Sequence, residues 1–130
     1  MEEFARIMKT NIQTLKKRAE ELWKEHAHKR DKERCRWCGL IWRNQVHHIM
    51  SRSHKNTFYD TENSMLLCGK CHFRVSKTMS PEVYMDIMKQ IIGEPKYNEL
   101  NEKRKIIKQW DRQSLEHLIN NLKLRIKELG

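Results

Sequence analysis

The chain has 130 residues, of which 38% are apolar and 34% are charged, and its formal net charge at pH 7 is +10. This length suits a single domain, residues 1–130, whose core is small enough to benefit from a metal staple. No apolar run approaches the roughly 18–20 residues that cross a bilayer, so a membrane-spanning protein is excluded. The positive charge favours nucleic acid as the partner, although any protein that binds acidic partners would share it.

The first region, residues 1–34, is predicted to be one amphipathic helix. Apolar side chains recur over residues 2–33 at the three- and four-residue spacing of a buried helix face: Phe4, Ile7, Met8, Ile12, Leu15, Ala19, Leu22 and Trp23. This stripe is expected to lie in the core or in a dimer seam. His26 and His28, like His117 near the other end of the chain, lie in charged helical stretches and are expected to be solvated.

Four cysteines form two pairs, Cys35-x2-Cys38 and Cys68-x2-Cys71, with 29 residues between them. Four thiolates make a tetrahedral structural zinc site with Zn–S bonds of about 2.3 Å, and two such pairs are a standard way to supply them. Disulfides, unpaired buried cysteines and redox thiols are the alternatives. Because residues 1–6 begin no apolar signal segment, we expect a cytoplasmic protein with reduced thiols and a structural Zn²⁺ ion.

The segment between the cysteine pairs is predicted to be a hairpin. An apolar-polar alternation marks a strand near 44–50, a polar loop follows, and a short strand near 64–67 leads to a helix from about Gly69. His47 and His48 are neighbours on the first strand, where adjacent side chains point to opposite faces. If both address one site, the strand should twist or bulge there. Otherwise, one histidine packs in the core and the other is exposed.

The third region, residues 80–130, is predicted to be helical. Ser80 followed by Pro81 is typical of a helix start, and Gly93 of its end. The stretch from about Tyr97 to Leu129 is expected to form one long or two shorter helices, with one apolar stripe that packs on this domain or on a partner chain: Leu115, Leu118, Ile119, Leu122, Ile126 and Leu129. The predicted class is therefore α+β, mostly helical, with a central hairpin.

Residues 35 to about 78 resemble the HNH nucleases, also called His-Me finger or ββα-metal nucleases. His47-His48 resembles the family's metal ligand and catalytic histidine, and Asn63 resembles its middle asparagine. The run from Glu62 to His72 is similar to the E-N-x-x-L-L-C-x-x-C-H form of zinc-stapled members. The resemblance implies an endonuclease that hydrolyses DNA, with His48 and Asn63 catalytic and with His47 and His72 holding a divalent ion.

The chemistry of phosphodiester hydrolysis agrees with these residue types. The reaction needs a deprotonated water, a counter-charge on the phosphoryl oxygens and help for the leaving oxygen. His48 can act as the general base, and Asn63 can fix its tautomer through a side-chain or backbone acceptor. His47 and His72 would hold Mg²⁺, Mn²⁺, Ni²⁺ or Zn²⁺. The alternative is a non-catalytic zinc module that binds nucleic acid, with structural histidines.

A wider resemblance extends to the NinG recombination proteins of lambdoid phages. It rests on Ser51-Arg52 after the strand, on Tyr84 and Gly93, and on the charged residues 100–129. The chain departs from NinG proteins at His47-His48, where they usually show H-A-G-H, and at the position of His72, where they often have Asn. The resemblance implies a phage nuclease of the host cytoplasm that acts on branched or recombining DNA. A homodimer or a phage protein complex formed through the helical flanks is compatible with this interpretation and with a zinc module.

Basic residues gather near the proposed site. Residues 35–80 carry a net charge of +5, against +3 for residues 1–34 and +2 for residues 81–130. The expected phosphate contacts are Arg52, Lys55, Arg74 and Lys77, because they flank the site. His54 lies in the polar loop and is either a third ligand or phosphate donor, or simply a loop residue. For Trp37, Trp42 and Phe73, core packing is favoured over base stacking.

Overall fold

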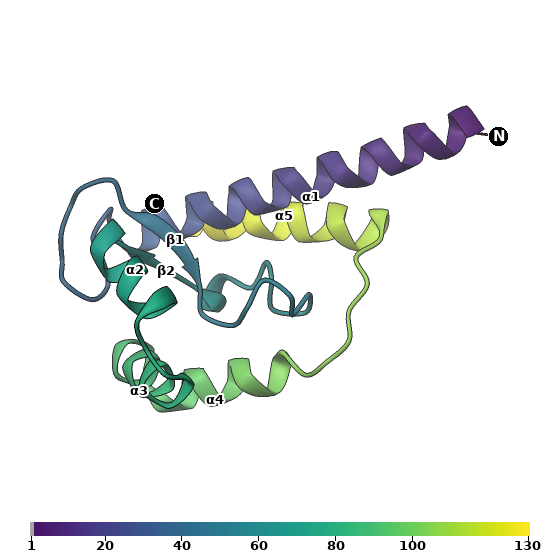
Figure 1. Ribbon diagram of the computed structural model, residues 1–130. Coiled ribbons are helices and arrows are strands. Elements are labelled where there is room, and N and C mark those ends of the chain that lie inside the picture. Colours follow the sequence, from purple (N-terminus) through teal and green to yellow (C-terminus); the bar gives the residue numbers. More distant parts are fainter. Residues whose placement is uncertain (1) are drawn as a thin grey trace.

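The computed structural model describes residues 2–130, apart from the side chains of residues 4–10. In this part of the chain, five α-helices surround a two-stranded antiparallel sheet (Figure 1). Their bounds are α1 Glu2–Arg30, β1 Gln45–His48, β2 Ser64–Leu67, α2 Gly69–Lys77, α3 Pro81–Ile92, α4 Glu94–Lys103 and α5 Arg112–Glu128, with a 3-10 turn, η1, at Thr61–Asn63. The α+β, mostly helical class is confirmed. None of the helices described is long and apolar enough to span a bilayer.

The longest helix, α1, packs side by side with α5 (Figure 1). Their apolar stripes meet in a core that also takes in Phe58 and Tyr59: Ala19, Leu22, Leu115, Ile119 and Leu122. The stripe predicted near the C-terminus is thus covered by a helix of the same chain, except at Leu129, which is 42% exposed. Of the stripe predicted for the first helix, Phe4, Ile7 and Met8 lie outside the described side chains.

A second core lies between the sheet and α2, α3 and α4. Its buried side chains include Met65, Leu67, Val75, Met88 and Leu100. The α3 helix begins as predicted, because the Ser80 hydroxyl accepts a hydrogen bond from the Val83 N–H at 3.3 Å. It ends at Gly93, whose φ of +91° is a conformation that L side chains rarely adopt. The chain turns there directly into α4, which therefore starts before Tyr97.

The end of α1 is tied to the outer edge of β2. The Arg30 guanidinium donates to the Thr61 and Ser64 carbonyls at 2.7 and 2.8 Å. The Asp31 carboxylate accepts the Leu66 N–H at 3.0 Å, and the Leu66 carbonyl accepts the Arg36 N–H at 2.8 Å. Burial raises the pKa of Asp31, but its hydrogen bond and charge interaction with Arg30 outweigh this and the pKa is lowered. The carboxylate therefore remains charged while it occupies the strand edge.

His26 corrects a prediction made from the sequence. Its side chain is buried, with 7% exposure, because its face of α1 turns toward the protein rather than toward solvent. Burial, followed by the charge of Arg30, lowers its pKa. His28 is half-buried and lies 2.8 Å from the Glu33 carboxylate, whereas His117 is exposed as expected. The charged sequence around His26 therefore concealed a buried position.

Candidate active site

The four cysteines meet where the turn before β1 reaches the end of β2 and the start of α2. All four are free, and their sulfurs lie within 4.8 Å of one another. The Cys38 and Cys68 sulfurs are 3.6 Å apart. Four sulfurs around a zinc ion at 2.3 Å would be separated by about 3.8 Å, whereas a disulfide requires about 2.05 Å. The cluster therefore fits the tetrahedral zinc site expected from the sequence.

Backbone hydrogen bonds and a helix cap hold the cysteines of this cluster in position. The Gly39 N–H donates to the Cys35 carbonyl at 2.9 Å, and the Gly39 φ of +82° closes the turn. Cys68 caps the start of α2, where its sulfur accepts the Cys71 N–H at 3.5 Å. Burial raises the pKa of the Cys35 thiol, but hydrogen bonds from Cys38 and Cys68 outweigh it and the pKa falls to about 7. A thiolate therefore forms readily at this position.

Three histidines line one cavity of about 270 Å³ together with Ser51 and Arg52. His47 and His48 come from β1, and His72 comes from the first turn of α2. The ring centroids of His47 and His72 are 5.3 Å apart. Because His72 directly follows the cysteine ligand at position 71, a metal in the cysteine cluster also fixes the position of His72.

Each of the two rings expected to bind the metal ion is held through one nitrogen. The Tyr84 hydroxyl donates to the Ile49 carbonyl at 2.7 Å, so it must accept from the His47 Nε2–H, which lies 2.8 Å away. His72 donates its Nδ1–H to the Gln45 Oε1 at 3.0 Å. These bonds leave lone pairs on His47 Nδ1 and His72 Nε2. Metal-binding histidines are usually oriented in this way, by a partner on the other ring nitrogen.

His48 is held in the same manner on the opposite side of the strand. Its Nε2–H donates to the Phe58 carbonyl at 3.1 Å, and its ring stacks on Trp23 with a centroid distance of 4.0 Å. The lone pair is therefore on Nδ1. Burial and then the positive charge of Arg52 lower the pKa of His48 to about 4, and burial also lowers the pKa of His47 to about 4. Both rings are neutral at physiological pH.

The strand carries both histidines without an extra residue. His47 pairs with Met65 and His48 pairs with Ser64 in uninterrupted register, so the expected bulge is absent from this ladder. His47 faces Tyr84 on α3 and His48 faces Trp23 on α1, as alternation along a strand requires. Both nevertheless line the cavity, together with Val46 from the same strand.

Asn63 closes the loop that carries the partner of His48. Its fully buried side chain accepts the Met50 N–H at 2.6 Å and donates to the Met50 and Thr57 carbonyls at 3.2 and 3.0 Å. Thr57 directly precedes Phe58, whose carbonyl holds the His48 ring. The group that accepts the His48 hydrogen bond is thus the Phe58 backbone carbonyl. Asn63 does not contact His48 through this bond but holds the neighbouring residue, Thr57, in place.

The order along the chain is a cysteine pair, a histidine pair at a strand end, a buried asparagine, and a second cysteine pair followed by a histidine. Residues 33–78 match the model of the HNH endonuclease family. This region has the sequence features of an HNH endonuclease domain. The comparisons with curated proteins and with solved structures gave no match. The domain holds the cysteine cluster and the histidines, whereas Trp23 and Tyr84, which position two of the rings, lie outside it.

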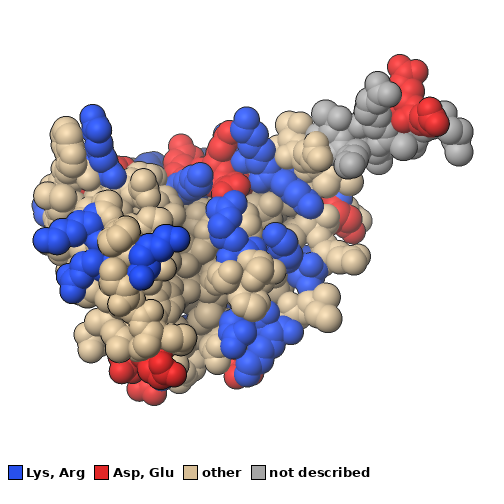
Figure 2. All heavy atoms as spheres, viewed as in Figure 1, with Lys and Arg blue, Asp and Glu red and all other residues tan. Residues whose placement is uncertain are grey.

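The basic residues expected to contact phosphate lie at different distances from the HNH cavity. Arg52 borders it and forms an ion pair with Glu20 at 3.0 Å. Lys55 lines a larger cavity that also includes Arg52. Arg74 and Lys77 lie in the last turn of α2. On the face shown in Figure 2, lysine and arginine side chains are spread widely, and most acidic side chains lie toward its upper and lower edges.

The aromatic residues around the cysteine cluster differ from expectation. Trp37 packs against the core as predicted, under the Arg74 guanidinium at 4.6 Å. Trp42 and Phe73 are 63% and 60% exposed, so the prediction of core packing was wrong for both. Trp42 lies in the loop before β1, and Phe73 lies on the outer side of α2. No element of the described chain covers either side chain. His54 contributes to its turn through its backbone, whose carbonyl accepts the Thr57 N–H at 3.2 Å.

The residues that orient the histidine rings were not identified from the sequence. Gln45 is two residues before His47, and Tyr84 is 37 residues after it. Phe58 takes part through its backbone carbonyl, which no side-chain pattern reveals. Tyr84 gave a signal only as part of a resemblance, and Trp23 only as part of an apolar stripe; neither was expected near the site.

Proposed function

We propose that the protein is a metal-dependent endonuclease that hydrolyses DNA phosphodiester bonds. One observation supports this best: each of the three histidines in the cavity donates one ring N–H to a protein oxygen and keeps a lone pair on its other nitrogen. A metal ligand or a general base needs this arrangement. In a non-catalytic zinc module, three oriented imidazoles around one cavity would serve no purpose, since the cysteines alone hold the zinc.

In this proposal, His47 Nδ1 and His72 Nε2 would hold one divalent ion. A bound ion would supply charge stabilisation at the phosphoryl and leaving oxygens. Two imidazole ligands admit Mg²⁺, Mn²⁺, Ni²⁺ or Zn²⁺. The Tyr84 and Gln45 hydrogen bonds keep the two rings in the tautomers that bind metal.

His48 is the proposed general base, with Nδ1 accepting a proton from the attacking water. The Phe58 carbonyl fixes the tautomer and stabilises the imidazolium that forms, and Trp23 fixes the plane of the ring. In the free protein, burial and Arg52 hold the pKa at about 4. A phosphate bound by Arg52 brings negative charge beside the ring and raises this pKa toward the working pH. Substrate binding therefore strengthens the base.

The proposed DNA contacts are Arg52, Lys55, Arg74 and Lys77, with Arg52 nearest to the scissile phosphate because it borders the histidine cavity. The resemblance to NinG proteins supports a narrower proposal, a phage nuclease that processes branched or recombining DNA. An association with a second copy or with another phage protein would use surfaces other than the apolar stripe of α5, because α1 covers that stripe.

The test is cleavage of supercoiled and branched DNA with Mg²⁺, Mn²⁺, Ni²⁺ or Zn²⁺. His48→Ala should lose about 10²–10⁴ in rate with unchanged DNA affinity, because it removes a positioned base. His47→Ala and His72→Ala should instead lose metal uptake and recover partly at raised metal concentration. Wild-type rates in His48→Ala, under matched metal and pH, would reject the catalytic assignment and favour the zinc module.

A further inference from the structure

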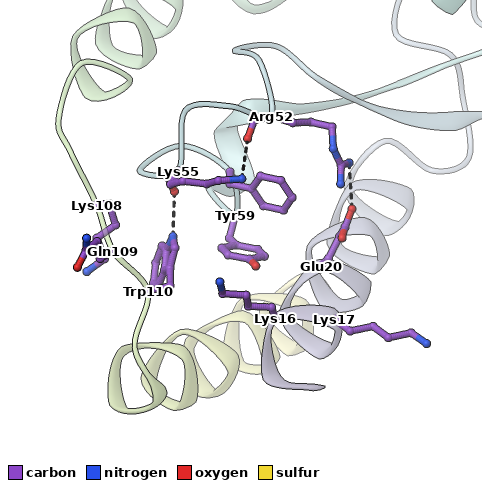
Figure 3. Close-up of a pocket in the computed structure, with 10 residues that line it drawn as sticks. Lys16, Lys17, Glu20, Arg52, Lys55, Tyr59, Lys108, Gln109 and Trp110 are labelled. Atoms are coloured by element: carbon purple, nitrogen blue, oxygen red, sulfur yellow. Dashed lines mark hydrogen bonds and ion pairs between the residues drawn. The ribbon is translucent and has the colours of Figure 1, made fainter. Parts of the chain in front are cut away.

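A second cavity, of about 680 Å³, is lined in part by Arg52 (Figure 3). Arg52 also borders the histidine cavity. Three separate segments form the walls of the second cavity: α1, the loop after β1 and the linker between α4 and α5. The linker is attached to the loop, because the Trp110 indole N–H donates to the Lys55 carbonyl at 2.9 Å. The volume falls in the range of about 300–1,000 Å³ that is typical of ligand sites.

The walls of this cavity are strongly basic. Their cations come from all three segments: Lys16, Lys17, Arg52, Lys55 and Lys108. The acidic residue of the lining, Glu20, forms an ion pair with Arg52 at 3.0 Å, so the excess positive charge comes from the lysines. Lys16 points into the cavity from α1, whereas Lys17 points away along the helix (Figure 3). Such a concentration of positive charge fits an anion that carries more than one phosphate.

Aromatic side chains complete the lining. Trp110 lies edge-on to Tyr59, with ring centroids 5.3 Å apart and an interplanar angle of 83°. The Lys108 ammonium lies 4.7 Å from the centroid of the Trp110 ring. Phe58, whose carbonyl holds the proposed catalytic histidine, also lines this cavity. A flat, partly exposed ring among lysines is the usual means of binding a base together with its phosphates.

We propose that this cavity binds an unpaired nucleotide of single-stranded DNA next to the scissile phosphate. The proposal rests on the proposed endonuclease function, because Arg52 connects the cavity to the histidines. The base stacks on Trp110 and displaces the flexible Lys108 side chain, whose ammonium then pairs with a phosphate alongside Lys16 and Lys55. A base inside a duplex is covered on both faces by its neighbours, so it cannot stack on a ring in a cavity wall unless it leaves the helix.

The first measurement is the affinity of the protein, without added divalent ions, for a labelled single strand and for the matching duplex. We expect tighter binding of the single strand, and Lys16→Glu should weaken it at least tenfold. The control is Lys123→Glu, which makes the same charge change at an exposed position of α5. Trp110→Ala should weaken single-strand binding about 5- to 100-fold, the usual effect of a lost stacking platform, and should change duplex binding less than twofold.

Equal losses in Lys16→Glu and Lys123→Glu would overturn the proposal, as would equal effects of Trp110→Ala on single strand and duplex. If Trp110→Ala fails to fold, the comparison of Lys16→Glu with Lys123→Glu decides the result. Cleavage with added ions is scored separately. If the protein binds single-stranded DNA as expected but cuts no DNA, the proposed nucleotide site stands and the proposed endonuclease function is rejected. If the protein cuts DNA but Lys16→Glu and Lys123→Glu lose equal affinity, the proposed endonuclease function stands and the proposed nucleotide site is rejected.

Discussion

Replacing Asn63 by alanine should lower the free energy of unfolding by about 2–5 kcal/mol. The side chain is fully buried and makes hydrogen bonds to the Met50 N–H, the Met50 carbonyl and the Thr57 carbonyl. Alanine removes these three hydrogen bonds at once, and a typical intramolecular hydrogen bond contributes about 0.5–1.5 kcal/mol to stability. A chain of 130 residues typically has roughly 6–20 kcal/mol of stability, so the variant should still fold.

Urea unfolding followed by circular dichroism at pH 7 measures this loss. Asn63→Asp keeps the acceptor for the Met50 N–H but places an oxygen against two carbonyls, so at pH 7 it should lose at least as much stability as alanine. Asn120→Ala, at an exposed position of α5, is the control and should change stability by less than about 0.5 kcal/mol. If Asn63→Ala lost as little as this control, the hydrogen bonds of Asn63 would not hold the loop, and the route from Asn63 through Phe58 to His48 would be refuted.

Three further outcomes are expected. The purified protein should contain about one zinc ion per chain by metal analysis, and Cys68→Ser should lose both the zinc and the near-ultraviolet dichroism of the packed core; well-folded protein without zinc would contradict this. Tyr84→Phe should weaken divalent-ion binding at His47 and His72 by about 10–100-fold in calorimetry, with unchanged zinc content, because the His47 tautomer is no longer fixed; equal affinity would exclude that role. Stability should fall as pH drops from about 6.5 to about 4, because unfolded His48 binds a proton in this window and folded His48 does not. His48 accounts for about 3 kcal/mol of this loss, and His47 and His26, whose pKa values are also lowered, add to it. The loss should therefore be smaller in His48→Gln, and equal losses in urea titrations of the two proteins would rule out this linkage.

Local signals were sufficient for the elements of the fold. The Ser80-Pro81 start and the Gly93 end of α3 depend on residues next to each other in the chain, and both agree with the structure. The hairpin and the cysteine cluster also follow from spacing, since two C-x2-C pairs that share one zinc ion must bring the ends of the intervening hairpin together. These features need no knowledge of how distant helices pack.

The surroundings of the histidines depend on packing between distant elements, which the sequence does not reveal. Trp23 lies 25 residues before His48 and stacks on its ring, and Tyr84 reaches His47 from α3. The burial of His26 and the exposure of Trp42 were missed for the same reason, because each depends on which face of an element another element covers. The Trp110 cavity likewise forms only when the linker meets the loop after β1.

The contact of Arg30 and Asp31 with the edge of β2 bears on how this HNH region can be moved between proteins. Both residues precede residue 33, where the family match begins, yet they occupy backbone groups that would otherwise leave an open strand edge. A graft of residues 33–78 alone would therefore carry the sequence motif together with a self-associating strand. The smallest transplantable cassette has to include the second half of α1, so evolution by domain shuffling would have to exchange this helix and the hairpin as one piece.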